Sequence, residues 1–191
     1  MVQPDAEMPN SLQEMLVIQS VTPSVTTLLW ETAKPTAALE HLEYHRFAHF
    51  SCHGKLEKGK PFEASFKLYE GARLTLLELV RSQLPTAKFA FLSACHTAEL
   101  TEESIADEGL HLTAAVQYCG FRSVVGTMWE MADIDGPDLV GNFYRSVFSD
   151  RQPDLPYYER TAEALRDAVR NLRRKRNMTL ERWVNFVHYG A

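Results

Sequence analysis

A histidine and a cysteine stand directly after two apolar segments of the chain. His53 follows residues 46–51, with one residue between, and Cys95 follows residues 88–93 in the same way. A cysteine thiol has a free pKa of about 8.5 and is mostly protonated at neutral pH. An imidazole beside it stabilises the nucleophilic thiolate and can later protonate the leaving group. The pair therefore predicts acyl chemistry in which Cys95 is the nucleophile and His53 the general base.

Backbone N–H groups beside this pair are candidates to stabilise the charge on an attacked carbonyl oxygen. Gly54 directly follows His53, and a glycine lets backbone come close to a substrate. We expect the N–H groups of Gly54 and Cys95 to be the oxyanion donors. The chain has no phosphate loop of the G-x-x-x-x-G-K type and no dinucleotide-binding fingerprint, so the sequence predicts no cofactor.

Predicted strands and helices alternate along the chain. Apolar or β-branched runs predict strands over residues 25–30, 46–51, 88–93 and 122–128, with an edge strand or hairpin arm over residues 63–69. Helices are expected over residues 11–19, 35–42, about 76–83, 107–118, 157–176 and 180–187, with another after the loop at residues 133–136. This alternation predicts an α/β fold with a mostly parallel sheet between helices. Ligands bind beyond the carboxyl ends of such strands, and neighbouring strands about 5 Å apart would bring His53 and Cys95 together.

Two of the expected helices carry local signals. Leu12, Met15 and Leu16 share one side of the first helix. Thr75 is followed three residues later by Glu78, the pattern of a capping box, so a helix is expected to begin after Thr75 and to end before Pro85.

The composition indicates one globular domain in a reducing compartment. The 191 residues are 45% hydrophobic and 24% charged, and the net charge of -5 gives no reason to expect nucleic-acid or membrane binding. No apolar run approaches the roughly 20 residues of a membrane span, and we do not expect residues 1–11 to be a signal peptide. Three cysteines do not suggest a disulfide framework, so we expect a cytoplasmic protein.

Acidic residues are expected at the same edge as the histidine and the cysteine. Asp133 and Asp135 follow the strand predicted over residues 122–128, and Glu108 stands at the start of the helix after Cys95. One interpretation is that Glu108, Asp133 and Asp135 line a pocket for a basic substrate side chain. The alternative is that they cap helices and solvate loops.

The remaining histidines and cysteines have structural interpretations. His41, His45, His49 and His53 are four residues apart and would make a zinc-binding stripe on one helix, but the predicted strand over residues 46–51 interrupts it, so no metal site is expected. His49 is expected to be a hydrogen-bonded structural histidine. Cys52 and Cys119 are expected in the core. His96 either tunes Cys95 or packs at the start of a loop.

Five motifs stand out along the chain: H-F-S-C-H-G (49–54), F-L-S-A-C-H-T-A (91–98), D-E-G-L-H-L (107–112), G-F-R-S-V-V-G-T-M-W (120–129) and R-W-V-N-F-V-H-Y-G (182–190). In these motifs the sequence resembles, over residues 25–190, the CHAT domain family of caspase-like and separase-like cysteine peptidase domains. The histidine after the cysteine and H-Y-G near the end resemble its fungal members.

The resemblance implies a caspase-like three-layer sandwich and a cysteine endopeptidase with a His53–Cys95 dyad. Caspase-type enzymes place the histidine roughly 50 residues before the cysteine, and the separation here, 95 − 53 = 42, is similar. The resemblance also implies a protein or peptide substrate, with a basic side chain in the pocket as separase-like relatives prefer. It further implies a repeat-containing regulatory partner on which activity depends. We expect an N-terminal segment over residues 1–24, partly disordered or a short helix, and the domain over residues 25–190. Since members usually have more sequence before the first strand, an N-terminal piece of the domain is expected to lie outside this chain.

Two other functions are compatible with the sequence. The first is a catalytically silent interaction or regulatory module that keeps the same fold. The second is a zinc-binding regulatory protein that uses the spaced histidines.

Overall fold

The computed structural model describes residues 1–2, 8–22, 24–55, 60–93, 105–149 and 156–190, with the backbone alone for residues 61 and 105–111. Cys95 and His96 therefore lie outside the described residues. Four strands form the central sheet in the order β1-β5-β6-β7: β1 (Phe47–Phe50), β5 (Phe89–Leu92), β6 (Ser123–Thr127) and β7 (Phe186–Gly190). β1, β5 and β6 are parallel and β7 is antiparallel to β6. The mostly parallel sheet predicted from the sequence is confirmed.

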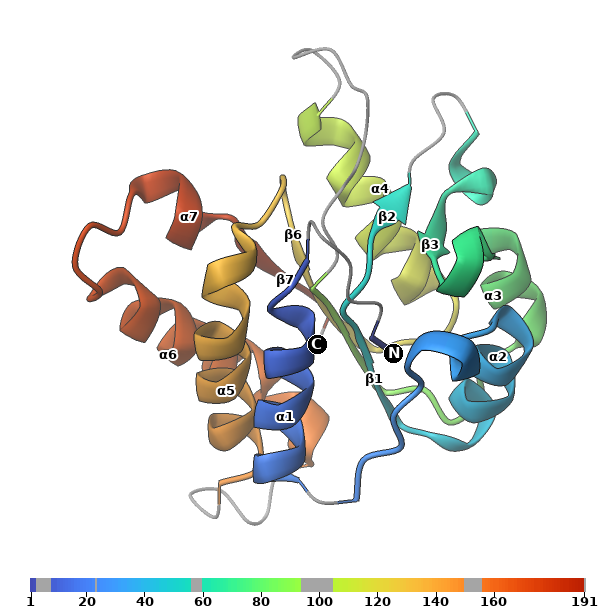
Figure 1. Ribbon diagram of the computed structural model, residues 1–191, viewed down its shortest axis with the longest axis horizontal. Coiled ribbons are helices and arrows are strands. Elements are labelled where there is room, and N and C mark those ends of the chain that lie inside the picture. The colour runs from blue at the N-terminus through green and yellow to red at the C-terminus, as the bar shows by residue number, and fades with distance from the viewer. Residues whose placement is uncertain (3–7, 23, 56–59, 94–104, 150–155, 191) are drawn as a thin grey trace.

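Helices cover both faces of this sheet (Figure 1). α1 (Ser11–Val21), α5 (Gly136–Val147) and α6 (Thr161–Arg173) lie on one face, and α2 (Pro35–Tyr44), α3 (Leu76–Ser82) and α4 (Ile105–Tyr118) on the other. Side chains of a strand point alternately to its two faces. In β5, Phe89 and Phe91 accordingly join the core with α1, α5 and α6, whereas Ala90 and Leu92 join the core with α2, α3 and α4. The molecule is a three-layer α/β sandwich.

A small antiparallel sheet lies on the same side of the central sheet as α3 and α4 (Figure 1). It consists of β2 (Gly54–Lys55), β3 (Ser65–Lys67) and β4 (Arg73–Thr75) in that order. β3 confirms the hairpin arm expected there. Thr75 then begins α3 with the predicted capping box: its hydroxyl accepts a hydrogen bond from the Glu78 N–H at 3.2 Å, and its own N–H donates to the Glu78 carboxylate at 2.8 Å.

Short helical turns complete the described chain. Single 3₁₀ turns are found at Trp30–Thr32, Pro61–Glu63, Tyr69–Gly71, Asp133–Asp135 and Tyr157–Arg160. The last of these begins the segment expected as one helix over residues 157–176, so that α6 itself starts only at Thr161.

The strand expected over residues 25–30 does not form. Of these residues only Leu29 makes a β-bridge, and its partner is Val2, which also bridges Ser51. Val2 thus lies between residues 25–30 and Ser51, which follows β1. It occupies the position in which residues 25–30 would otherwise pair with the β1 chain. The β-branched sequence was a correct sign of extended backbone, but a strand also needs a partner at hydrogen-bond distance.

Two further expectations were wrong in detail. The helix expected over residues 180–187 ends as α7 (Leu180–Val184), and β7 follows. Asn185 separates them because its side chain bonds the backbone N–H and C=O of Trp129, each at 2.9 Å. In α1 the buried residues are Ser11, Glu14 and Ile18, whereas Leu16 is 59% exposed.

Gly126 permits α4 to approach β6 closely, which gives the first prediction. A Cβ at position 126 would lie 2.5 Å from Oγ1 of Thr113 in α4. We expect Gly126→Ala to lower the free energy of unfolding by about 1–3 kcal/mol through overpacking, as measured by urea denaturation. Thr113→Ala removes that hydroxyl, so Gly126→Ala should be less damaging in its background. Equal losses in both backgrounds would contradict the close approach.

Candidate active site

His53 lies just beyond the carboxyl end of β1. Its side chain is buried, with 2% of the residue exposed. Its C=O accepts a hydrogen bond from the Lys67 N–H at 2.8 Å, and the following residue, Gly54, begins β2 and is the register partner of Phe66. The candidate base is therefore held by the hairpin of the small sheet as well as by β1.

The Gly54 N–H points away from β3. The bond between His53 and Lys67 makes these two residues a hydrogen-bonded pair of the antiparallel ladder. Pairs alternate along such a ladder, so Gly54 and Phe66 form a pair that does not exchange ladder bonds. This direction suits a backbone oxyanion donor.

The carboxyl end of β5 lies beside that of β1. Each β1 residue pairs with the residue 42 positions later, from Phe47 with Phe89 (89 − 47 = 42) to Phe50 with Leu92 (92 − 50 = 42). His53 and Cys95 are separated by the same 42 positions. Ser93 directly follows β5 and is fully buried.

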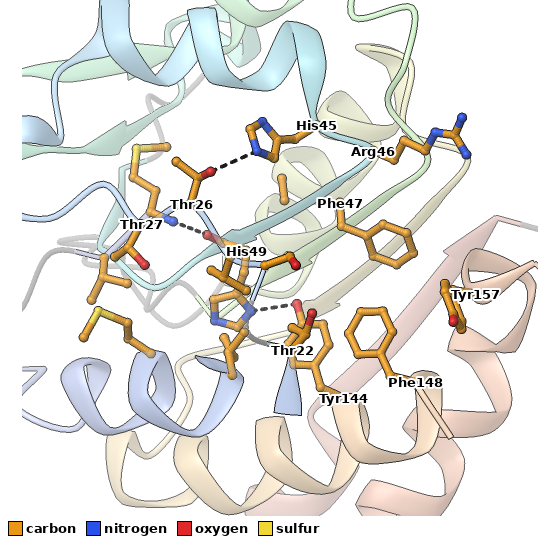
Figure 2. A pocket seen from close by; sticks show the side chains of 17 residues that line it. Thr22, Thr26, Thr27, His45, Arg46, Phe47, His49, Tyr144, Phe148 and Tyr157 are labelled. Carbon is orange, nitrogen blue, oxygen red and sulfur yellow. Dashed lines mark hydrogen bonds between the residues drawn. The ribbon is translucent and has the colours of Figure 1, made fainter. Parts of the chain in front are cut away.

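A buried chain of hydrogen bonds crosses β1 and β5 on the face of the sheet that α1 and α5 cover. Glu14 of α1 accepts from the Ser93 hydroxyl at 2.8 Å through Oε1, and its Oε2 lies 3.2 Å from His49 Nε2. On the other side of the imidazole, His49 Nδ1 lies 3.1 Å from the Tyr144 hydroxyl of α5 (Figure 2). The expectation that His49 is a hydrogen-bonded structural residue agrees with these contacts.

One arrangement of protons satisfies this whole chain. Tyr144 donates to Nδ1 of a neutral His49, the Nε2–H donates to Glu14, and Ser93 donates to the other carboxylate oxygen. Burial lowers the pKa of His49, and this outweighs the attraction of the Glu14 carboxylate. Burial likewise raises the pKa of Tyr144, which keeps its hydroxyl protonated. Sequence reasoning missed Glu14, although its spacing from Ser11 and Ile18 was the available signal for one helix face.

The two described acidic candidates have partners within the chain. Asp133 Oδ2 accepts from the backbone N–H of Asn10 at 2.9 Å and from its side-chain amide at 2.6 Å. Asp135 is buried and receives two hydrogen bonds from the Arg182 guanidinium, at 2.8 and 2.7 Å. The Glu108 side chain lies outside the described residues. A role of the three in substrate binding stays a prediction.

The other cysteines are buried in the core. Burial raises the pKa of Cys52 to about 12 and that of Cys119 to about 11, so both thiols stay protonated at neutral pH. The Cys119 thiol donates to the Ala115 C=O at 3.1 Å. Both observations agree with the expected structural role of these residues.

The spaced histidines do not form one stripe. His41 and His45 lie at the end of α2, His49 lies in β1, and His53 follows β1. His45 bonds the Thr26 hydroxyl at 3.1 Å and the His41 C=O at 2.7 Å. Within the described ranges, no group of three or more histidine, cysteine or acidic side chains could hold a metal ion.

A cavity of about 320 Å³ lies along the outer edge of β1 (Figure 2). Phe47, His49, Tyr144, Phe148 and Tyr157 are among the residues that line it, and His53 is not. It is thus separate from the strand end that carries His53.

In the part of the chain that the structure describes, no helix has both the length and the apolar character to cross a membrane.

The sandwich, with its parallel strands β1, β5 and β6, has a caspase-like fold. The family model described as CHAT domain matches residues 2–191, and the chain belongs to this family. Comparison with curated proteins found no match.

The ion pair at Asp135 gives a prediction that concerns stability. Asp135→Asn removes the carboxylate charge that accepts two hydrogen bonds from the Arg182 guanidinium. We therefore expect the free energy of unfolding, measured by urea denaturation, to fall by about 1–3 kcal/mol. Asp138 is a matched control because its partner, Lys175, is an exposed cation, and exposed ion pairs contribute little. Equal, small effects of Asp135→Asn and Asp138→Asn would contradict a structural role for Asp135.

Buried histidine makes stability depend on pH. The pKa of His49 is lower in the folded chain than its ordinary value of 6.5. As pH falls below that value, the unfolded chain binds a proton that the folded chain resists, and the free energy of unfolding decreases. The contribution of one such group is at most about 1.4 kcal/mol per pH unit. We expect His49→Gln to have a shallower decline than the unaltered chain between pH 7 and 5.5.

This experiment compares slopes, so an overall loss of stability in the variant does not affect it. His188→Gln is the companion variant: burial also lowers the pKa of His188, which is half-buried, so a smaller change in the same direction is expected. A His49→Gln slope identical to that of the unaltered chain would contradict the assignment.

Proposed function

We propose that this CHAT domain is a cysteine endopeptidase of the caspase and separase type, with Cys95 as nucleophile and His53 as general base. The observation that carries the proposal is the register of β1 and β5. If the 42-residue offset of the described pairs continues past the strand ends, His53 and Cys95 are opposite one another, about 5 Å apart at the backbone. Membership of a peptidase-related family supports the same pair.

The reaction follows the chemistry of an imidazole and a thiol. His53 takes the proton of Cys95, and the sulfur attacks the carbonyl carbon of the scissile peptide bond. The Gly54 and Cys95 N–H groups stabilise the oxyanion, and the amine leaves with the proton from His53. A water molecule, deprotonated by His53, then hydrolyses the thioester, and the thiol regains its proton.

We further assign the acidic residues Glu108, Asp133 and Asp135 to the pocket for a basic side chain before the scissile bond. Asp135 supports this region by holding Arg182, since both of its oxygens accept hydrogen bonds from that side chain. A peptide library that varies the residue before the scissile bond measures this preference directly.

The proposal predicts the effect of three single variants on cleavage. Cys95→Ala and His53→Ala should each lower kcat/KM by at least about a thousand-fold, as loss of a nucleophile or its base does in other hydrolases. Cys119→Ala is the matched control, because its thiol is buried and protonated, and it should retain activity. The measurement is cleavage of the peptide library by the full chain, followed by mass spectrometry.

Labelling with a peptide that carries a thiol-reactive group separates an enzyme from a silent module of the same fold. An activated thiol should react at Cys95 much faster than at Cys52 or Cys119, and His53→Ala should slow that reaction. Full cleavage by Cys95→Ala would show the assignment to be wrong. Absence of both cleavage and selective labelling in the unaltered chain would favour the silent module.

A further inference from the structure

We propose that Glu14 is a positioning residue for the catalytic pair. Its buried carboxylate joins the two strands that lead to His53 and Cys95 and fixes their ends relative to each other. The inference rests on the proposed function, because a positioning role has meaning only if the two side chains react.

The contacts of Glu14 reach both strands at once. Oε1 accepts a hydrogen bond from Ser93, which directly follows β5 and stands two residues before Cys95. Oε2 lies 3.2 Å from His49 in β1, four residues before His53. A side chain from α1 therefore links β1 and β5 in addition to their backbone ladder, on the side where the candidate residues follow.

The Glu14 carboxylate lies close to the amino end of α5. A Cβ on Gly136, the first residue of α5, would lie 1.8 Å from Oε1, so the absence of a side chain there lets the carboxylate sit against this helix. The amino end of a helix carries partial positive charge, which favours a carboxylate. Glu14 itself is fully buried.

The chain of hydrogen bonds does not itself form a second catalytic group. In a Ser-His-acid triad the histidine lies between the serine and the acid. Here Glu14 lies between Ser93 and His49, and the far side of the imidazole faces the Tyr144 hydroxyl. Among the described residues, the Ser93 hydroxyl therefore bonds a carboxylate and not an imidazole, and the network is suited to holding groups in place.

A positioning role and a purely structural role differ in what they do to turnover. Loss of one hydrogen bond to a strand end lowers stability in either case. Only a positioning role changes the alignment of the reacting atoms, and a misplacement of about 1 Å can lower the rate about a hundredfold. The effect should appear in kcat, with little change in KM, because substrate contacts remain.

The test compares two buried serines of the same sheet. Ser93→Ala removes the hydroxyl that donates to Glu14. Ser123→Ala removes a hydroxyl of β6 that is equally buried and bonds Thr161 and His188, at the opposite end of the parallel strands. Ser93→Thr keeps the hydroxyl and is the conservative rescue. Unfolding is measured for each variant, and kinetics are recorded where all of them are folded.

We expect Ser93→Ala and Glu14→Gln to lower kcat about tenfold to a hundredfold with KM within about twofold, and to slow labelling of Cys95 by the thiol-reactive peptide. Ser123→Ala should lose comparable stability and keep its kcat, and Ser93→Thr should recover part of the lost rate. Labelling supplies a second measurement that needs no turnover.

The failures of the two proposals are distinguishable. If the unaltered chain cleaves, Cys95→Ala does not, and Ser93→Ala and Glu14→Gln behave like Ser123→Ala, the proposed function stands and the positioning role is wrong. If the unaltered chain neither cleaves nor labels selectively at Cys95, the proposed function is wrong and the positioning role falls with it.

Discussion

The parallel pairing of β5 with β1 on one side and with β6 on the other is the constraint on which the fold depends. All four β5 residues are buried, so apolar layers must cover both faces of the strand. Parallel neighbours cannot be joined by a tight turn, and the chain between them must cross back over the sheet. The segment between β1 and β5 contains the small sheet and α3, and the segment between β5 and β6 contains α4. Both candidate catalytic residues stand at the start of these crossings.

Burial of polar groups inside this sandwich has to be compensated. A carboxylate without partners in the interior is strongly unfavourable, and Glu14 avoids this through Ser93 and His49. The same contacts specify how α1 docks, because a rotation of the helix would separate both carboxylate oxygens from Ser93 and from Nε2 of His49. An apolar residue at position 14 could fill the space, but it would not connect the two strand ends. The polar network thus adds specificity to a layer whose stability comes from apolar packing.

The sequence allowed the central strands to be predicted because their signal is local. Residues 88–93 are apolar almost throughout, and the capping box at Thr75 is a four-residue pattern. The failures have a common cause in contacts between distant segments. Residues 25–30 have strand propensity, but Val2 takes the neighbouring position. Residues 186–190 form a strand because β6 has a vacant edge, which no local pattern in a short helix-like segment reveals. The catalytic candidates were found from the ends of strands, whereas the burial of Glu14 depends on partners 35 to 79 positions away.

The two candidate residues differ in how the chain supports them. His53 is tied to β3 through its own C=O, so the small sheet fixes the base independently of the helices on the opposite face. On the β5 side, the corresponding fixed point is Ser93, and its side-chain partner comes from α1. A displacement of α1 would therefore disturb the nucleophile side more than the base side, although His49 carries part of it to β1. A partner that shifts α1 would therefore act on the alignment of the proposed catalytic pair through the Glu14 carboxylate, which contacts both strands.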